Sequence, residues 1–142
     1  MLQRVSEASV SVEGRTIARC GHGLVILLGI ATGDDGGRAR RLATKVAELR
    51  IFDDGRGRFD RSLLDVGGEA LVVSQFTLLA DASKGRRPSF AAAAPAEVAE
   101  PLYEEFCAAL AEHGVRVAQG AFGARMQVFL VNEGPVTIVL DV

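Results

Sequence analysis

The sequence predicts a β-rich α/β protein in which two helices pack on one face of a sheet with mixed strand directions. Three observations lead to this prediction. About seven or eight short segments carry strand patterns, two longer segments have apolar residues at helical spacing, and residues 24–30 are apolar throughout. A strand without polar positions is typical of one that is covered on both faces. The length of 142 residues fits one domain, 1–142.

The first part of the chain has the pattern of a hairpin followed by a buried strand. In residues 8–12, small and apolar residues alternate with two serines, as in a half-buried strand. Glu13 and Gly14 supply a turn, and residues 16–20 run back. Residues 21–23 then separate this hairpin from the apolar strand at 24–30.

The first helix is predicted after a loop rich in Gly and Asp at 32–37. Apolar residues recur at helical spacing while charged residues take the outward positions. Asp34 or Asp35 is suited to cap this helix. Its buried face is expected to consist of Ala39, Leu42, Ala43, Val46 and Leu49.

The remaining strands are short and are separated by polar loops. We expect a brief strand at 51–52, a turn at 53–58, a strand at 69–78 and a loop at 80–89. Near the C-terminus the pattern predicts a strand at 126–131, a break at 132–135 and a last strand at 136–142.

The second helix is expected to begin near Pro95 or Pro101 and to run to His113, where Gly114 ends it. Pro101 either begins the regular part of this helix or kinks it. The apolar residues expected to be buried are Val98, Leu102, Phe106, Ala109 and Leu110.

Composition excludes several classes of protein. With 49% hydrophobic residues the chain is not of the disordered type, and its two cysteines do not make a disulfide framework. No apolar run reaches the roughly 20 residues that span a bilayer, and the chain opens without a signal-peptide pattern, so we expect a cytoplasmic protein with no membrane partner. A net charge of −2 is unlike that of proteins that grip long duplex nucleic acid, so any nucleic-acid contact is expected to be small and local.

The common catalytic patterns are missing, and three polar stretches remain as candidates. Cys and His do not occur at metal-ligand spacing, no glycine-rich phosphate loop is present, and His22 and His113 are interpreted as structural. Ser74, Gln75, Phe76 and Thr77 end an apolar strand, where polar residues often face a cleft, although a plain strand end is equally in keeping with the pattern. Residues 132–137 suit a hairpin connection, and residues 84–88 suit either a solvated loop or a phosphate contact.

These stretches occur together in one known family. The segments 74–78 (SQFTL), 87–90 (RPSF), 126–128 (MQV) and 132–137 (NEGPVT) follow one another at the order and spacing of the D-aminoacyl-tRNA deacylases, which the whole chain from Gln3 onward resembles. Two departures stand out. Only Met1 and Leu2 precede Gln3, so the first strand is expected to be shortened, and Pro101 lies where the family usually has no proline.

The resemblance implies a fold, a reaction and a set of site residues. The fold would have three layers, α/β/β, and the reaction would be hydrolysis of the ester between a D-amino acid and the 3′ end of a tRNA, with no cofactor and no metal. The enzyme would be a homodimer in which Gly134 and Pro135 of one subunit, joined by a cis peptide bond, enter the partner's active site. Arg4 and Met126 would support that element. Catalytic candidates are Ser74, Gln75, Phe76 and Thr77, and candidate tRNA contacts are Lys84, Arg86 and Arg87.

This chemistry is reasonable without an acid–base pair because an aminoacyl ester is already activated. Backbone N–H groups that face the developing oxyanion, and a ribose 2′-hydroxyl held next to the ester, would supply the acceleration. Thr77 is an alternative nucleophile, but the sequence shows no base that would activate it.

Selection of the D enantiomer would follow from a rigid backbone wall beside Cα, which excludes every L side chain and tolerates any D side chain. Because glycine has no side chain, cleavage of glycyl-tRNA is expected. Two other interpretations stay open: a related deacylase that removes a mischarged L-amino acid, and a non-catalytic module that binds the tRNA acceptor end.

Overall fold

The computed structural model describes residues 1–142 and contains eight strands, two α-helices and one short 3-10 helix, η1. The elements in chain order are β1 (Leu2–Val12), β2 (Arg15–Cys20), β3 (Gly23–Leu28), α1 (Gly36–Glu48), β4 (Phe52–Asp53), β5 (Phe59–Arg61), β6 (Glu69–Ser74), η1 (Phe76–Leu79), α2 (Ala96–Glu112), β7 (Arg116–Gln119) and β8 (Gln127–Ile138). Neither helix combines the length and the apolar character that crossing a membrane requires.

Six of the strands form one mixed sheet, as the sequence predicts. Its order is β2-β1-β3-β6-β7, and β8 pairs with β1. β1 is antiparallel to β2, β3 and β8, whereas β6 is parallel to both β3 and β7. β2 and β3 pair in turn along β1, so they form one antiparallel partner of β1 that is interrupted at Gly21 and His22. β1 is therefore the central strand, and β8 lies along its other edge.

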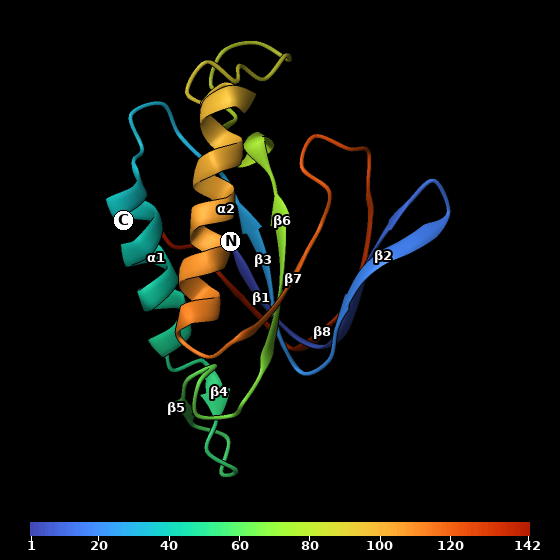
Figure 1. The fold of residues 1–142 in the computed structure, drawn as a ribbon, viewed down its shortest axis with the longest axis vertical. Helices are drawn as coiled ribbons and strands as arrows, with labels where there is room; N and C mark the ends of the chain where they lie inside the picture. Colours follow the sequence, from blue (N-terminus) through green and yellow to red (C-terminus); the bar gives the residue numbers. More distant parts are fainter.

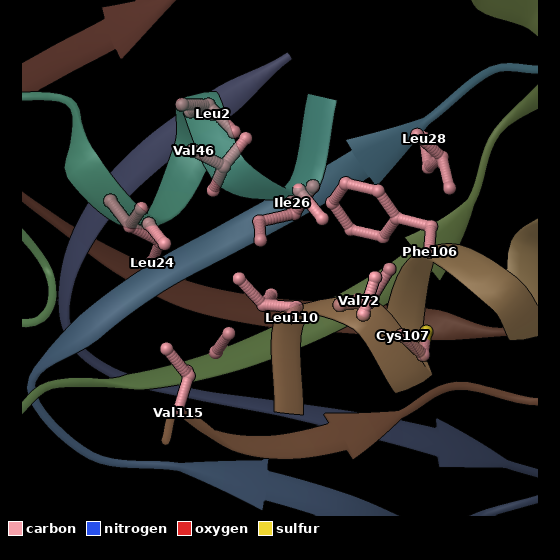
Figure 2. Close-up of a cluster of buried hydrophobic side chains, with 14 of the residues drawn as sticks. Leu2, Leu24, Ile26, Leu28, Val46, Val72, Phe106, Cys107, Leu110 and Val115 are labelled. Atoms are coloured by element: carbon pink, nitrogen blue, oxygen red, sulfur yellow. The ribbon is translucent and has the colours of Figure 1, made fainter. Parts of the chain in front are cut away.

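The sheet has an apolar core on each face. One core lies between the sheet and the two helices, which pack side by side against the same face (Figure 1). In Figure 2, Val46 of α1 and Phe106 and Leu110 of α2 point toward Ile26 of β3 and Val72 of β6. The other core is formed by residues of all six strands, because the sheet curls and β2 and β8 extend away from the helices. The layered α/β fold is thus confirmed.

β3 shows how the two cores share one strand. Leu24, Ile26 and Leu28 belong to the helix-facing core, whereas Val25 belongs to the core on the opposite face. All four side chains are at most 5% exposed. The expectation that this apolar strand is covered on both faces is confirmed, although the strand ends at Leu28 rather than at Ile30.

The prediction of a strand from Glu69 to Leu78 is wrong in its second half. β6 ends at Ser74, which pairs with Leu28, the last residue of β3, while β7 pairs with β6 only as far as Val72. Beyond Ser74 no neighbouring strand is left to pair with, and the chain turns into η1. This turn places the polar stretch of residues 74–77 at the C-terminal end of β6.

The C-terminal strands also differ from the prediction. A single strand, β8, pairs with β1 on both sides of residues 133–136, which form a bulge between the pairs Val5–Asn132 and Gln3–Thr137. The expected break is therefore a bulge within one strand, and no strand continues after Ile138. Two short strands without a strong pattern, β5 and β7, were not predicted.

The helix boundaries follow the sequence signals closely. α1 is capped by Asp35, whose side chain accepts a hydrogen bond from the Arg38 N–H at 2.8 Å. α2 begins directly after Pro95 and contains Pro101 in its interior. Val98, expected in the core, is 44% exposed because it lies in the first turn of α2 on the face away from the buried side chains.

Candidate functional site

A cavity of about 470 Å³ opens where β6 ends. Ser74, Gln75 and Phe76 form one wall, and the small residues Ala96 and Ala99 of α2 with Gly123 and Ala124 leave the space open. Met126 completes the wall, and its sulfur lies against Gly120, where a Cβ atom would come within 2.9 Å of it. The lining is mostly apolar with a few polar groups, which is typical of a small-molecule site. Three of the predicted site residues are thus brought together with Met126.

η1 carries the remaining residue of the polar stretch. Thr77 is exposed, and its hydroxyl accepts a hydrogen bond from the side-chain amide of Gln75. No histidine, carboxylate or lysine bonds to this hydroxyl. Thr77 therefore follows the cavity-lining residue Phe76 in the chain, does not itself line the cavity, and has no base that would activate it.

The basic loop, residues 82–88, follows η1 and is closed at its base. Asp81 and Ser89 exchange two backbone hydrogen bonds of 2.8 Å. The Asp81 carboxylate also accepts the Ser83 N–H at 2.9 Å, and hydrogen bonding with the Ser83 side chain and backbone lowers the pKa of Asp81 below its usual value. Phe90, just past the loop, packs edge-on against Phe76 with the ring centroids 5.1 Å apart. The loop is thereby attached to the wall of the cavity.

The three basic side chains of this loop are free to meet a ligand. Lys84, Arg86 and Arg87 are exposed, and none of them takes part in an ion pair. Three unpaired positive charges beside an apolar cavity suit an elongated ligand with phosphate groups.

The motif 132–137 forms the bulge of β8. The Gly134–Pro135 peptide bond is cis, as the family resemblance implies, and Gly134 has a φ of 136°. Asn132 accepts the Val136 N–H at 2.8 Å and donates to the Thr137 hydroxyl at 3.0 Å. The Asn132 side chain therefore closes the bulge from one end to the other. Sequence reasoning quoted Asn132 and Thr137 as part of the motif but gave them no role.

Arg4 also stabilises this bulge, through contacts of its guanidinium group. It is one of only two buried polar or charged residues, at 7% exposed, and its Nε donates to the Glu133 carbonyl at 3.0 Å. Its Nη2 lies against Gly134, 3.1 Å from where a Cβ atom would stand. The side chains of Arg4 and Asn132 thus fix the bulge, in which Gly134 and Pro135 are exposed.

Within one chain the bulge and the cavity lie at opposite ends of the sheet. Arg4 pairs with Leu24 near the start of β3, whereas the cavity lies where β3 ends beside Ser74. Four residues of strand separate these levels by roughly 13 Å. The sequence interpretation named Arg4 and Met126 as supports of Gly134 and Pro135; within one chain Arg4 contacts the bulge and Met126 lines the cavity.

The other reactive side chains lie elsewhere. Burial, with Glu69 nearby, raises the pKa of the Cys20 thiol to about 11, and burial with Glu104 nearby raises that of Cys107 to about 12, so both stay protonated at neutral pH. His22 packs edge-on against Phe52. No group of three or more His, Cys, Asp or Glu side chains is arranged to hold a metal ion.

The chain was compared with known families and proteins. The model of the family described as D-Tyr-tRNA(Tyr) deacylase matches residues 1–141. The D-aminoacyl-tRNA deacylase of Roseiflexus castenholzii is 62% identical over 141 residues, which are 99% of this chain and 90% of that protein. The D-aminoacyl-tRNA deacylase of Dinoroseobacter shibae is 60% identical, with 99% and 97% covered.

Two solved structures share the fold. The c-Myc DNA Unwinding Element Binding Protein superposes with a TM-score of 0.93 at 40% sequence identity, covering 99% of this chain and 96% of that one. A probable eukaryotic D-amino acid tRNA deacylase superposes with a TM-score of 0.79 at 20% identity, covering 94% and 93% of the two chains.

Proposed function

The chain belongs to the D-Tyr-tRNA(Tyr) deacylase family and hydrolyses the ester of D-aminoacyl-tRNA, and we propose that it does so at the cavity beside Ser74, Gln75 and Phe76. The observation that carries the proposal is the junction of this apolar cavity with the basic loop. The cavity has the volume to take an aminoacyl group with part of the terminal adenosine, and the loop offers positive charge where the tRNA backbone would continue.

Catalysis in this site relies on the substrate's own chemistry and on backbone dipoles. η1 begins at Phe76, and the first N–H groups of a helix lack acceptors within the helix, so they are suited to face a developing oxyanion. The Thr77 hydroxyl, bonded only by an amide donor, serves to orient Gln75. The ribose 2′-hydroxyl of the substrate then assists the departure of the ester oxygen, and water completes the hydrolysis.

We also propose that the enzyme is a homodimer with shared sites. Gly134 and Pro135 lie exposed at one end of the sheet, and the cavity is open at the other. A two-fold axis that sets two chains side by side in opposite directions would carry each Gly134–Pro135 bulge to the partner's cavity. The bulge would then supply the backbone wall beside Cα that excludes L side chains.

The primary experiment is deacylation of matched D- and L-tyrosyl-tRNA by the purified protein. Rapid release of D-tyrosine with the L substrate left intact is expected. Glycyl-tRNA should be cleaved measurably, because glycine offers no side chain for the wall to reject. Preferential release of the L-amino acid, or binding without turnover, would contradict the proposed specificity.

Shared sites are tested by mixing Phe76→Ala, whose cavity is inactive, with Gly134→Ala, whose cavity is active but whose bulge no longer excludes the L substrate. Random exchange of subunits pairs half of the active cavities with an intact bulge, so the release of L-tyrosine per active cavity should fall by about half. A mixture that releases L-tyrosine as fast per active cavity as Gly134→Ala alone would show that each chain works with its own bulge.

The tRNA contact is tested by the salt dependence of binding. With three basic side chains at the acceptor end, the slope of log K against log salt is expected to be shallow, about −2 to −3. The double variant Arg86→Ala/Arg87→Ala should reduce this slope, while Arg116→Ala, whose charge is paired with Glu69, should not. A steep slope that neither variant changes would locate the tRNA surface elsewhere.

A further inference from the structure

The small hairpin of β4 and β5 is a separate element at the base of the molecule. Its two strands form a sheet of their own and make no backbone ladder with the main sheet. In Figure 1 the hairpin lies below the end of α1, far from the basic loop above α2. None of its residues lines the cavity. Its polar and aromatic side chains instead meet Arg4, the residue that supports the Gly134–Pro135 bulge.

Three contacts hold the Arg4 guanidinium: two with residues of the hairpin and one with Ile51, which directly precedes it. Its Nη1 donates to the Ile51 carbonyl at 3.0 Å and to the Asp53 carboxylate at 3.3 Å. Its Cζ also lies 5.6 Å from the centroid of the Phe59 ring, within the range of a cation–π contact. Phe59 itself is 53% exposed and belongs to neither apolar core, so its contact with Arg4 is not enforced by core packing.

The same guanidinium determines where the bulge can lie. Nε donates to the Glu133 carbonyl while Nη2 lies against Gly134, so hairpin and bulge contact opposite parts of one planar group. A guanidinium is rigid and its donors point in fixed directions. A rotation of Arg4 that follows a change in the hairpin must therefore move the backbone at 133–134.

We propose that Asp53 and Phe59 are positioning residues for the rejection of L-aminoacyl-tRNA, acting through Arg4 on the Gly134–Pro135 bulge. The inference rests on the proposed function, in which this bulge is the wall beside Cα. Discrimination by a wall depends on its distance from Cα, and misplacement by about 1 Å costs catalysis on the order of a hundredfold. A loosened bulge admits the L side chain without removing any group that takes part in hydrolysis.

A purely structural role for these two residues makes a different prediction. If they only stabilised the hairpin, Asp53→Asn and Phe59→Leu would lower the unfolding temperature and leave the D-to-L selectivity unchanged. The Asp53 side chain is 46% exposed, so water weakens its ion pair with the buried Arg4. Asp53→Asn also keeps an oxygen that can accept from Arg4, so its effect on thermal unfolding should be small.

The experiment compares Asp53→Asn and Phe59→Leu with a matched control on the same hairpin. Asp60→Asn removes a carboxylate of β5 that is paired with Arg50 at 3.5 Å and does not touch Arg4. The quantity measured is the ratio of kcat/KM for D-tyrosyl-tRNA to that for L-tyrosyl-tRNA. Each test variant should lower this ratio by roughly three- to tenfold, mainly through increased L-tyrosine release, because a single charge-assisted or cation–π contact is lost. Asp60→Asn should keep the wild-type ratio.

A conservative variant of Phe59 and an NMR measurement without substrate complete the test. Phe59→Tyr keeps the ring face and should retain the wild-type ratio within about twofold. The amide resonance of Gly134 should shift in Asp53→Asn and Phe59→Leu and stay in place in Asp60→Asn. If Gly134→Ala lowers the ratio but both test variants match Asp60→Asn, the positioning role is wrong and the proposed function stands. If Gly134→Ala also leaves the ratio unchanged, the bulge is not the wall beside Cα, and the proposed wall and the positioning role are both wrong.

Discussion

Gly134 is the position where the proposed wall can be perturbed with a single methyl group. Its φ of 136° is one that L residues rarely adopt, so alanine there carries backbone strain of about 1–3 kcal/mol. A Cβ atom would also stand 2.8 Å from Cγ2 of Val136 and 3.1 Å from Nη2 of Arg4. Val136 is buried, so relief of this overlap adds about 1–3 kcal/mol. The free energy of unfolding of Gly134→Ala should therefore fall by about 2–6 kcal/mol.

Gly14→Ala is the matched control for this substitution. Gly14 also has a positive φ, 76°, but no atom lies within 4 Å of the added Cβ. Only the backbone cost remains, about 1–2 kcal/mol. The difference between the two variants therefore measures the contacts of Gly134 with its surroundings.

The two variants are compared by urea denaturation at equal protein concentration and by deacylation of D- and L-tyrosyl-tRNA. Gly134→Ala should be the less stable and should lower the D-to-L ratio of kcat/KM by about tenfold or more, whereas Gly14→Ala should keep the ratio. Equal stability and equal selectivity of the two variants would refute both the tight packing of the bulge and its place beside Cα.

Three further outcomes are expected. Thr77→Ala should keep deacylase activity within about tenfold of the wild type, whereas the wild-type enzyme should cleave a D-aminoacyl-tRNA ending in 2′-deoxyadenosine about a hundredfold more slowly than the normal substrate. If Thr77→Ala is inactive and the deoxy substrate is cleaved at the normal rate, Thr77 is the nucleophile. Tyr103→Phe should lower the free energy of unfolding by only about 0.5–1.5 kcal/mol in urea denaturation. The reason is that the Val72 carbonyl accepts the Gly120 N–H at 2.9 Å as well as the Tyr103 hydroxyl at 2.8 Å, so it keeps a partner in the variant. A loss above about 3 kcal/mol would show that this second hydrogen bond does not compensate. Hydrogen bonds with the backbone and side chain of Ser62 hold the pKa of Asp65 below its usual value, so the contribution of Asp65 to stability is present above about pH 4 and is lost as pH falls further. In pH-dependent denaturation, the stability advantage of the wild type over Asp65→Asn should be constant at neutral pH and vanish in acid. An advantage that grows in acid would contradict this sign.

Patterns that depend on one stretch of chain were sufficient to predict most elements. The apolar run of β3, the helical spacing of α1 and the capping Asp35 are local signals, and each corresponds to an element of the structure. The order and spacing of the motifs 74–78 and 132–137 were sufficient to predict the family, because such residue strings are themselves the evidence. Sequence therefore determined the fold class, the reaction and the residues to examine.

Tertiary structure decided what depends on a neighbouring strand or a distant side chain. β6 stops at Ser74 because β3 and β7 offer no further partner, and β8 continues through its bulge because β1 pairs with both halves. No pattern in a single stretch contains that information. The same holds for Arg4, whose hydrogen bonds and cation–π contact come from residues 47 to 129 positions away in the chain, and for the separation between the bulge and the cavity. Pairing and burial are properties of the assembled sheet, and only the assembled sheet shows which polar residues meet.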